Sequence, residues 1–203
     1  MHGGQDNRAV DTWRREMRTS ARGQSALLMA DIAEFLVAQG VRYAVIGAMA
    51  AAVHGVVRAS LAADAVVTLS VREARALREL LVEAGHEAQV RTGGVDDPIP
   101  ALLEIRDRHG NRVDLLIGLR GMDPEALNRT RQVALAGTTL EIVGREDFVA
   151  MKAFAGGPVD LADARAVMDL DRETLDVELL RRLAQRFGRE TVTAVDLLVS
   201  AAD

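Results

Sequence analysis

The chain has 203 residues, 49% of them hydrophobic and 27% charged, a balance typical of a globular protein with one sizeable domain. Its 25 basic and 30 acidic residues give a net charge of −5, which argues against a surface that coats nucleic acid. The absence of cysteine excludes disulfides and zinc–thiolate sites. No apolar stretch reaches the roughly 20 residues of a membrane span, so we expect a cytoplasmic protein with no membrane contact.

The chain begins with an arm and a helix. Residues 1–22 are polar and basic and contain the lone Trp13, so we interpret them as a polar N-terminal arm. Residues 24–39 place Leu28, Ile32 and other apolar side chains on one helical face, and Gly40 ends this helix. The helix opens an α/β core that we expect to extend over residues 23–144.

The stretch from Tyr43 to Val67 alternates strand, turn, helix and strand. An apolar run from Tyr43 to Ile46 predicts a buried strand that ends at Gly47-Ala48. An alanine-rich helix follows and stops at His54-Gly55. The next apolar run contains a single acid, Asp64, and predicts a second strand.

The remainder of the core combines a helix with further strands. Ser70 and Glu73 form a capping box that opens a helix running to Gly85. Residues 91–100 are rich in glycine and proline and predict a loop. The other predicted features are a β-hairpin of 101–105 and 113–117, a helix start at Asp123-Pro124, and two short strands near 133–136 and 140–143.

From residue 145 onward the pattern is helical. The predicted helices span 145–155, 161–170 with Asp160 as N-cap, 176–187 with Asp176 as N-cap, and 190–201. We therefore expect a helical C-terminal subdomain over 145–203, packed on the core.

The order of elements between Tyr43 and Val67 resembles the opening of the nucleotidyltransferase fold. In that family the second strand normally reads Arg-x-Thr-x-Asp-x-Asp, and here it reads Arg58-Ala59-Ser60-Leu61-Ala62-Ala63-Asp64. The position of the first metal-binding aspartate is Ala62. The resemblance implies a mixed α/β sheet, an α+β nucleotidyltransferase fold with a helical C-terminal subdomain.

Two isolated aspartates are the candidate metal ligands. Aspartates two positions apart on a strand point to one side, which suits Mg²⁺, but only Asp64 of such a pair is present. Asp114 lies in the otherwise apolar run Val113–Ile117, where a carboxylate is costly unless it is paired or bound to metal. A helix cap or an ion pair with an arginine such as Arg58 is the structural alternative for both. The resemblance implies that Asp114 contacts the metal or activates the acceptor hydroxyl.

Residues before the second strand are the candidate nucleotide-binding residues. The turn at Gly47 and Ala48 would let backbone N–H groups face phosphate oxygens. The resemblance adds Arg58 and Ser60, with Arg58 either meeting a phosphate or holding Asp64. We interpret His54 as a helix-end residue rather than a catalytic base.

Residues 143–163 are similar to a segment of AbiEii-like nucleotidyltransferases, in which a helix carries a lysine and the next helix begins at Asp-x-x-Asp. The lysine position is occupied by Lys152, the only lysine of the chain, and the resemblance implies that it binds the nucleotide and neutralises triphosphate charge during catalysis. Asp160 and Asp163 would either cap the next helix or face the cleft. Asp96-Asp97 would either line the substrate mouth or initiate a turn.

The function implied by the resemblance is Mg²⁺- or Mn²⁺-dependent transfer of a nucleotidyl group from an NTP to a hydroxyl of RNA, protein or a small molecule. A tRNA, or a partner toxin or antitoxin protein, would fit a toxin–antitoxin or phage-defence role. We expect Ala62 to impair this activity. Ala62 has three open explanations: a deliberate substitution, a natural loss of activity, or replacement by another carboxylate. The alternative function is an inactive module that binds a nucleotide or a partner protein.

Overall fold

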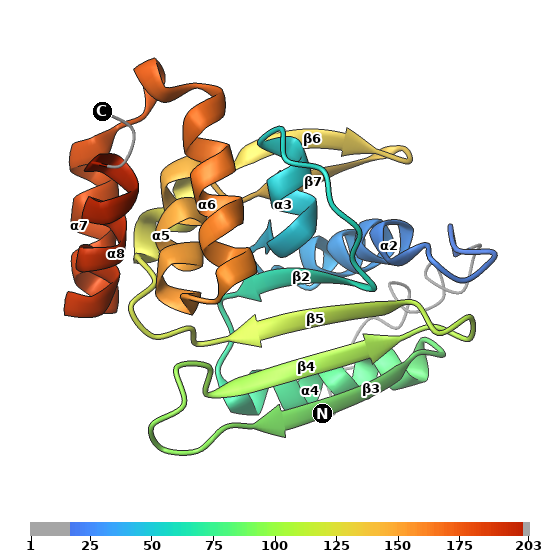
Figure 1. The fold of residues 1–203 in the computed structure, drawn as a ribbon. Coiled ribbons are helices and arrows are strands. Elements are labelled where there is room, and N and C mark those ends of the chain that lie inside the picture. The colour runs from blue at the N-terminus through green and yellow to red at the C-terminus, as the bar shows by residue number, and fades with distance from the viewer. Residues whose placement is uncertain (1–16, 201–203) are drawn as a thin grey trace.

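The fold is a mixed α/β sheet with helices on both sides, as the sequence predicted (Figure 1). The computed structural model describes residues 17–200, so Trp13 and most of the N-terminal arm lie outside the described residues. The seven strands are arranged in the order β3-β4-β5-β2-β1-β7-β6. Their bounds are β1 Tyr43–Ile46, β2 Ala62–Val67, β3 Glu87–Thr92, β4 Ala101–Arg106, β5 Arg112–Ile117, β6 Arg131–Leu135 and β7 Thr138–Ile142.

Strand β2 lies at the centre of the sheet and has neighbours of both orientations. It pairs antiparallel with β1 and parallel with β5, while β4 pairs antiparallel with β5. The predicted hairpin of β4 and β5 is confirmed. Because the side chains of a strand alternate between the two faces, Ala63 and Ala65 of β2 point into the core and Asp64 points to the opposite face.

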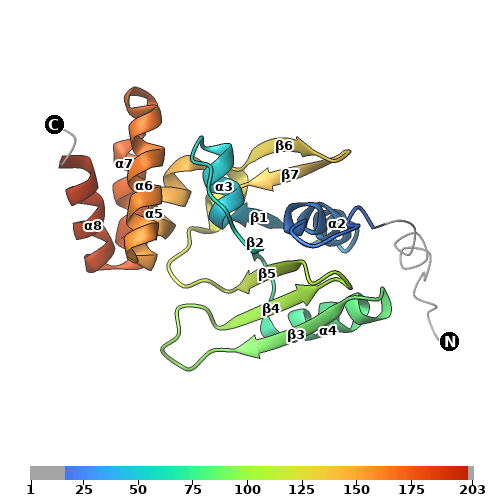
Figure 2. The same cartoon turned by 45° about the vertical axis from the view of Figure 1, so that its right-hand side comes forward.

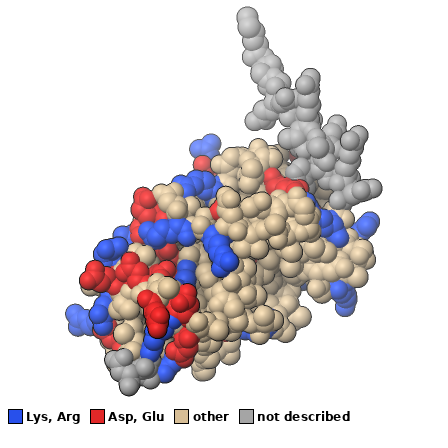
Figure 3. All heavy atoms as spheres, turned by 90° about the horizontal axis from the view of Figure 1, so that it is seen from above, with Lys and Arg blue, Asp and Glu red and all other residues tan. Residues whose placement is uncertain are grey.

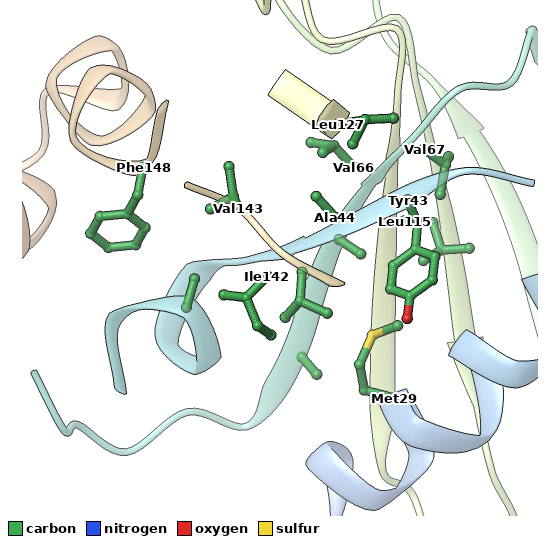
Figure 4. Close-up of a cluster of buried hydrophobic side chains, with 14 of the residues drawn as sticks. Met29, Tyr43, Ala44, Val66, Val67, Leu115, Leu127, Ile142, Val143 and Phe148 are labelled. Carbon is green, nitrogen blue, oxygen red and sulfur yellow. The ribbon is translucent and has the colours of Figure 1, made fainter. Parts of the chain in front are cut away.

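Helices α2 (Ser25–Ala38) and α4 (Val71–Glu83) cover one face of the sheet (Figures 1 and 2). Ser70 caps α4 through the predicted capping box with Glu73. Figure 4 shows part of the core, in which Met29 of α2 packs beside Tyr43 and Leu115 of the strands. Burial of these apolar side chains is the main source of stability of the fold.

Residues 145–200 form four α-helices and a short 3-10 helix (Arg172–Thr174), which gather beside the sheet (Figure 1). Their bounds are α5 Arg145–Ala155, α6 Pro158–Leu170, α7 Val177–Phe187 and α8 Arg189–Ser200. Buried apolar residues of these helices belong to the same hydrophobic cluster as those of the sheet. The short helix α3 (Gly47–Val53) lies between this helical part and the strands (Figure 2).

One expectation about local structure was wrong, and one strand was not predicted. Residues 87–92 form strand β3, which the sequence did not reveal because its polar residues are those of a half-exposed edge strand. Helix α6 begins at Pro158 with Gly157 as N-cap, so Asp160 and Asp163 lie inside the helix. The reason is that proline suits the first helical position. The predicted helix start at Asp123-Pro124 is confirmed, with Asp123 as N-cap, and the helix is a short 3-10 helix, Pro124–Asn128.

Basic and acidic side chains are mixed on the helical part (Figure 3). Arg181 pairs with Asp196 at 2.9 Å, and Arg186 donates to the carbonyls of Gly121 and Met122. In the described part of the arm, Arg18 pairs with Asp31 at 2.6 Å and anchors the segment on α2. These arginines are therefore engaged in the protein's own contacts. None of the helices within residues 17–200 combines the length and the apolar character that crossing a bilayer requires.

Candidate functional site

Asp64 and Asp114 lie side by side on the face of the sheet opposite α2 and α4. They are register partners on the parallel strands β2 and β5. On the other side of Asp64 the partner residue is Ile46, the last residue of β1. The pairing of strands that are far apart in sequence thus brings together the two acids that the sequence singled out.

Gly47 lies directly against the Asp64 carboxylate. Its φ of +64° is a left-handed conformation that glycine adopts without strain. A Cβ added at this position would overlap Oδ2 of Asp64 and lie 3.2 Å from its Cγ. The turn after β1 therefore requires glycine both for its backbone angle and for the close approach of Asp64.

The surroundings of the two acids favour their protonated forms. Burial is the main cause that raises the pKa of Asp64, and the neighbouring Asp114 carboxylate raises it further. Burial also raises the pKa of Asp114, while the Arg112 guanidinium opposes the shift. Asp114 Oδ1 is buried and has no hydrogen-bond partner. An oxygen in this state is a candidate ligand atom or proton acceptor.

A third acid, Glu104, lies beside Asp114 on the neighbouring strand, and the sequence did not identify it as a candidate site residue. It is the register partner of Asp114 on β4. Its carboxylate is held by Arg106 at 2.9 Å and by Arg91 at 3.5 Å. The hydrogen bond from Arg106 is the main cause that lowers the pKa of Glu104. Glu104 is thus an ion-paired acid on the far side of Asp114 from Ala62.

Lys152 belongs to a compact cluster of charges between the core and the helical part. Its Nζ lies 2.6 Å from Asp160 Oδ1 and 3.0 Å from Asp163 Oδ2. Arg58 Nε donates to the same Asp163 Oδ2 at 3.0 Å. Lys152 and Arg58 both exert a Coulombic influence on Asp64. The alternative in which Arg58 forms an ion pair with Asp64 is not observed, because Arg58 pairs with Asp163.

The other predicted residues near the turn make contacts within the protein. The Ser60 hydroxyl donates to the carbonyl of Ala62 at 2.7 Å and so shapes the start of β2. Ala48 is buried in α3. His54 follows the end of α3, as predicted, and its Nε2 donates to the carbonyl of Val143 at 2.9 Å. Burial lowers the pKa of His54.

An apolar pocket of about 270 Å³ opens beside Gly47 and Lys152. The loop before β4 contributes to its wall through Pro98 and Ile99. Asp97 Oδ1 accepts a hydrogen bond from the backbone N–H of Ile99 at 2.8 Å, so Asp97 forms a turn that shapes this wall. The remaining apolar lining comes from Ile46, Leu116, Leu119, Phe148, Met151, Phe154 and Ala155.

The two facing acids fit one divalent metal ion. Mg²⁺ is usually held by one or two protein carboxylates, with water and substrate phosphates as the other ligands. Asp64 and Asp114 offer such a pair, and the unpartnered Oδ1 of Asp114 is consistent with a ligand atom. Within residues 17–200 no three His, Cys, Asp or Glu side chains gather into a ready-made metal centre. Ala62 supplies no ligand.

Comparison with solved structures confirms the nucleotidyltransferase-like fold. An antigenic nucleotidyltransferase-like protein from Paracoccidioides brasiliensis is 16% identical, with a TM-score of 0.54 over 90% of this chain and 91% of that chain. The solution structure of the antibiotic-resistance factor ANT(2'')-Ia is also 16% identical, with a TM-score of 0.52 over 88% of this chain and 97% of that chain. No protein-family model and no curated protein matches the sequence. At this identity the likeness shows the fold alone, and the AbiEii-like resemblance stays a prediction.

Proposed function

We propose that the chain binds a nucleoside triphosphate with Mg²⁺ or Mn²⁺ and transfers a nucleotidyl group from it to an acceptor hydroxyl. The observation that carries the proposal is the register pairing of Asp64 with Asp114, next to Gly47 and at the edge of an apolar pocket. The nucleotidyltransferase-like fold supports the same function by analogy.

The pocket is the proposed site of the nucleobase. Its lining is mainly aliphatic and aromatic, which suits the faces of a planar ring. Lys152 and Asp160 stand at its edge, and Gly47 brings the pocket next to Asp64. A nucleotide with its base in this pocket would therefore direct its phosphates toward the carboxylate pair.

In the proposed reaction the acceptor oxygen forms a bond to the α-phosphorus while the bond to pyrophosphate breaks. The hydroxyl proton goes to the Asp114 carboxylate, because its raised pKa makes it a better base than an exposed aspartate. Asp64 and Asp114 would hold the metal ion, which supplies positive charge to the phosphates when bound. Lys152 and Arg58 add positive charge near the same site.

We expect a slow enzyme in this sequence. Because Ala62 provides no carboxylate, part of the charge stabilisation is missing, and a loss of several kcal/mol corresponds to roughly a thousandfold in rate or more. The second candidate function, a module that binds a nucleotide or partner protein without catalysis, is favoured by Ala62 and by the pairing of Lys152 with two aspartates.

The AbiEii-like resemblance suggests the molecules whose hydroxyl group accepts the nucleotidyl group, and we include them in the proposal. An RNA such as tRNA, a partner toxin or antitoxin protein, or a small molecule each offers a hydroxyl. A role in a toxin–antitoxin or phage-defence system would accompany the first two.

The test combines transfer with binding. Each NTP labelled at the α-phosphate is incubated with the protein, Mg²⁺ or Mn²⁺, and in turn bulk RNA, cell lysate proteins and small-molecule extract. Label transfer that is lost in Asp114→Asn and kept in Asp169→Asn, a surface control on α6, would support catalysis. Calorimetric binding of an NTP without transfer would support the binding module. Neither binding nor transfer with any NTP would contradict nucleotidyl transfer and nucleotide binding, and would leave only the binding of a partner protein.

A further inference from the structure

Two rows of charged side chains cross β4, β5 and β2 on the face that carries the candidate site. The acid row is formed by Glu104, Asp114 and Asp64, which are register partners in that order. The second row lies two residues away on each strand, where Arg106 faces Arg112 and Arg112 faces Ala62. Arg112 and Ala62 precede the acids of their strands, whereas Arg106 follows Glu104 because β4 is antiparallel to β5. Position 62 thus continues a row of arginines, and its neighbour across the strands is a cation.

The facing of Ala62 and Arg112 is fixed by the start of helix α2. The hydroxyl of Ser25 donates to the carbonyl of Leu61 at 2.9 Å. The same oxygen accepts the backbone N–H of Arg112 at 3.1 Å. Because one side chain bridges the beginnings of β2 and β5, the register of position 62 against position 112 is held from both strands.

Arg112 forms its ion pair with the acid of its own strand. Its Nη2 lies 3.0 Å from Asp114 Oδ2. Arg106 and Glu104 repeat this arrangement on β4, two residues apart at 2.9 Å. Ala62 presents only a methyl group toward Arg112, so no acid at position 62 draws the guanidinium away from Asp114.

We propose that Arg112 is a built-in cation of the carboxylate site and limits it to one divalent ion per bound nucleotide. The inference rests on the proposed function. The Arg112 guanidinium cancels one of the two negative charges of Asp64 and Asp114, so the protein offers metal ions only one net negative charge. A second ion would need a further carboxylate, and it would be repelled by the adjacent guanidinium.

The same geometry sets the effect of restoring an aspartate at position 62. A carboxylate there would face Arg112 and pair with it, so the substitution alone adds no metal site. Removing the charge of Arg112 together with Ala62→Asp frees the new carboxylate for a second ion. The residue at position 62 and the charge at position 112 therefore together determine how many metal ions the site holds.

The test counts the Mn²⁺ ions bound per chain. The free Mn²⁺ is measured from its electron paramagnetic resonance signal and subtracted from the total Mn²⁺ added. The protein is saturated in turn with the α,β-methylene analogues of ATP, GTP, CTP and UTP. We expect one Mn²⁺ per chain for the unaltered protein, one for Ala62→Asp, and two for the double variant Ala62→Asp/Arg112→Gln. In the Ala62→Asp background, the matched controls Arg106→Gln and Arg112→Lys both keep the count at one, because each leaves a positive charge at position 112. If the glutamine variant does not fold, Arg112→Leu takes its place, since it also removes that charge.

Two ions in the unaltered protein, or in Ala62→Asp alone, would overturn the role of Arg112 and leave the proposed function standing. Two ions with Arg106→Gln would likewise overturn it, because the effect would then not be specific to position 112. If no variant binds Mn²⁺ with any of the four analogues, the proposed function fails, and the inference fails with it.

Discussion

Asp64 lies directly beside Asp114 on the neighbouring parallel strand, and Asp114 Oδ1 is buried without a hydrogen-bond partner. Two partly desolvated acids in this position repel each other, which is the arrangement that a cation relieves. Their placement is unfavourable for the stability of the protein alone. This is expected of a site that is completed by a ligand.

We expect Asp64→Asn to stabilise the protein at neutral pH. The substitution removes a buried charge and its repulsion with Asp114, and a gain of about 1 kcal/mol would raise Tm by roughly 2–4 °C in a chain of this size. Asp114→Asn is the matched comparison and should gain less or lose, because it deprives Arg112 of its partner. Thermal unfolding followed by circular dichroism measures both. A lower Tm for Asp64→Asn would contradict the repulsion.

The stability that Asp64→Asn gains over the unaltered protein should increase with pH. The folded protein raises the pKa of Asp64 above its ordinary 3.8, so the folded state holds this proton more tightly than the unfolded state. Below pH 3.8 both states are protonated and the two proteins should differ least. As pH rises from 3.8 through the raised pKa, the unaltered protein loses stability relative to the variant, and the difference is constant above. A difference that shrinks with rising pH would be the opposite result.

Gly47→Ala should harm both stability and metal binding. The left-handed backbone costs an alanine about 1–2 kcal/mol, and the overlap with Asp64 adds about 1–3 kcal/mol. Displacement of the Asp64 carboxylate should also weaken Mn²⁺ binding in the presence of nucleotide. Urea unfolding and a Mn²⁺ titration measure the two effects.

Gly40→Ala is the control for this substitution. Gly40 has a φ of +69°, close to that of Gly47, but a Cβ there meets no atom within 4 Å. It should show the backbone cost alone and leave Mn²⁺ binding unchanged. Equal losses of stability in the two variants would mean that the close approach of Gly47 to Asp64 contributes nothing to the effect of Gly47→Ala.

The sequence predicted the parts of the site whose signal is local. The limits of β1, the end of α3 at His54 and the capping box at Ser70 follow from hydrophobic runs, glycine and capping chemistry. Asp64 and Asp114 were recognised because each is a single acid in an apolar strand. A buried strand rarely carries a carboxylate without a partner or a ligand, so this signal needs no knowledge of the fold.

The contacts that depend on strand register could not be predicted. Glu104 in the strand Ala101–Arg106 looks like an ordinary polar position until β4 is known to pair with β5. The facing of Ala62 and Arg112 needs the parallel pairing of strands 50 residues apart. Likewise, the ion pairs of Lys152 with Asp160 and Asp163 depend on how α5 packs against α6.

Arg129 holds helix α5, and with it Lys152, in place. Its Nε and Nη2 donate to the two oxygens of buried Asp147 at 2.8 Å, and Nη2 also reaches Asp123 at 2.9 Å. Arg129→Met leaves the Asp147 carboxylate buried without this partner, so we expect a loss of about 3–5 kcal/mol in the free energy of unfolding. Arg181→Met, which breaks a half-exposed pair with Asp196, should cost about 1 kcal/mol or less. Similar losses in urea unfolding would contradict a special role for Arg129.

Asp160→Asn should strengthen nucleotide binding. Asp160 lines the apolar pocket and holds Lys152 Nζ at 2.6 Å. Its carboxylate repels a triphosphate, and it also pairs with the Lys152 ammonium group that would otherwise bind the phosphates. Removing that charge leaves Lys152 its contact with Asp163, and a gain of about 1 kcal/mol corresponds to roughly a fivefold lower Kd. Calorimetry with each NTP and Mg²⁺ measures the change. Asp169→Asn, on the same helix but in a surface pair with Arg165, should leave Kd unchanged. Weaker binding by Asp160→Asn would show that Asp160 positions Lys152 for the phosphates rather than competing with them.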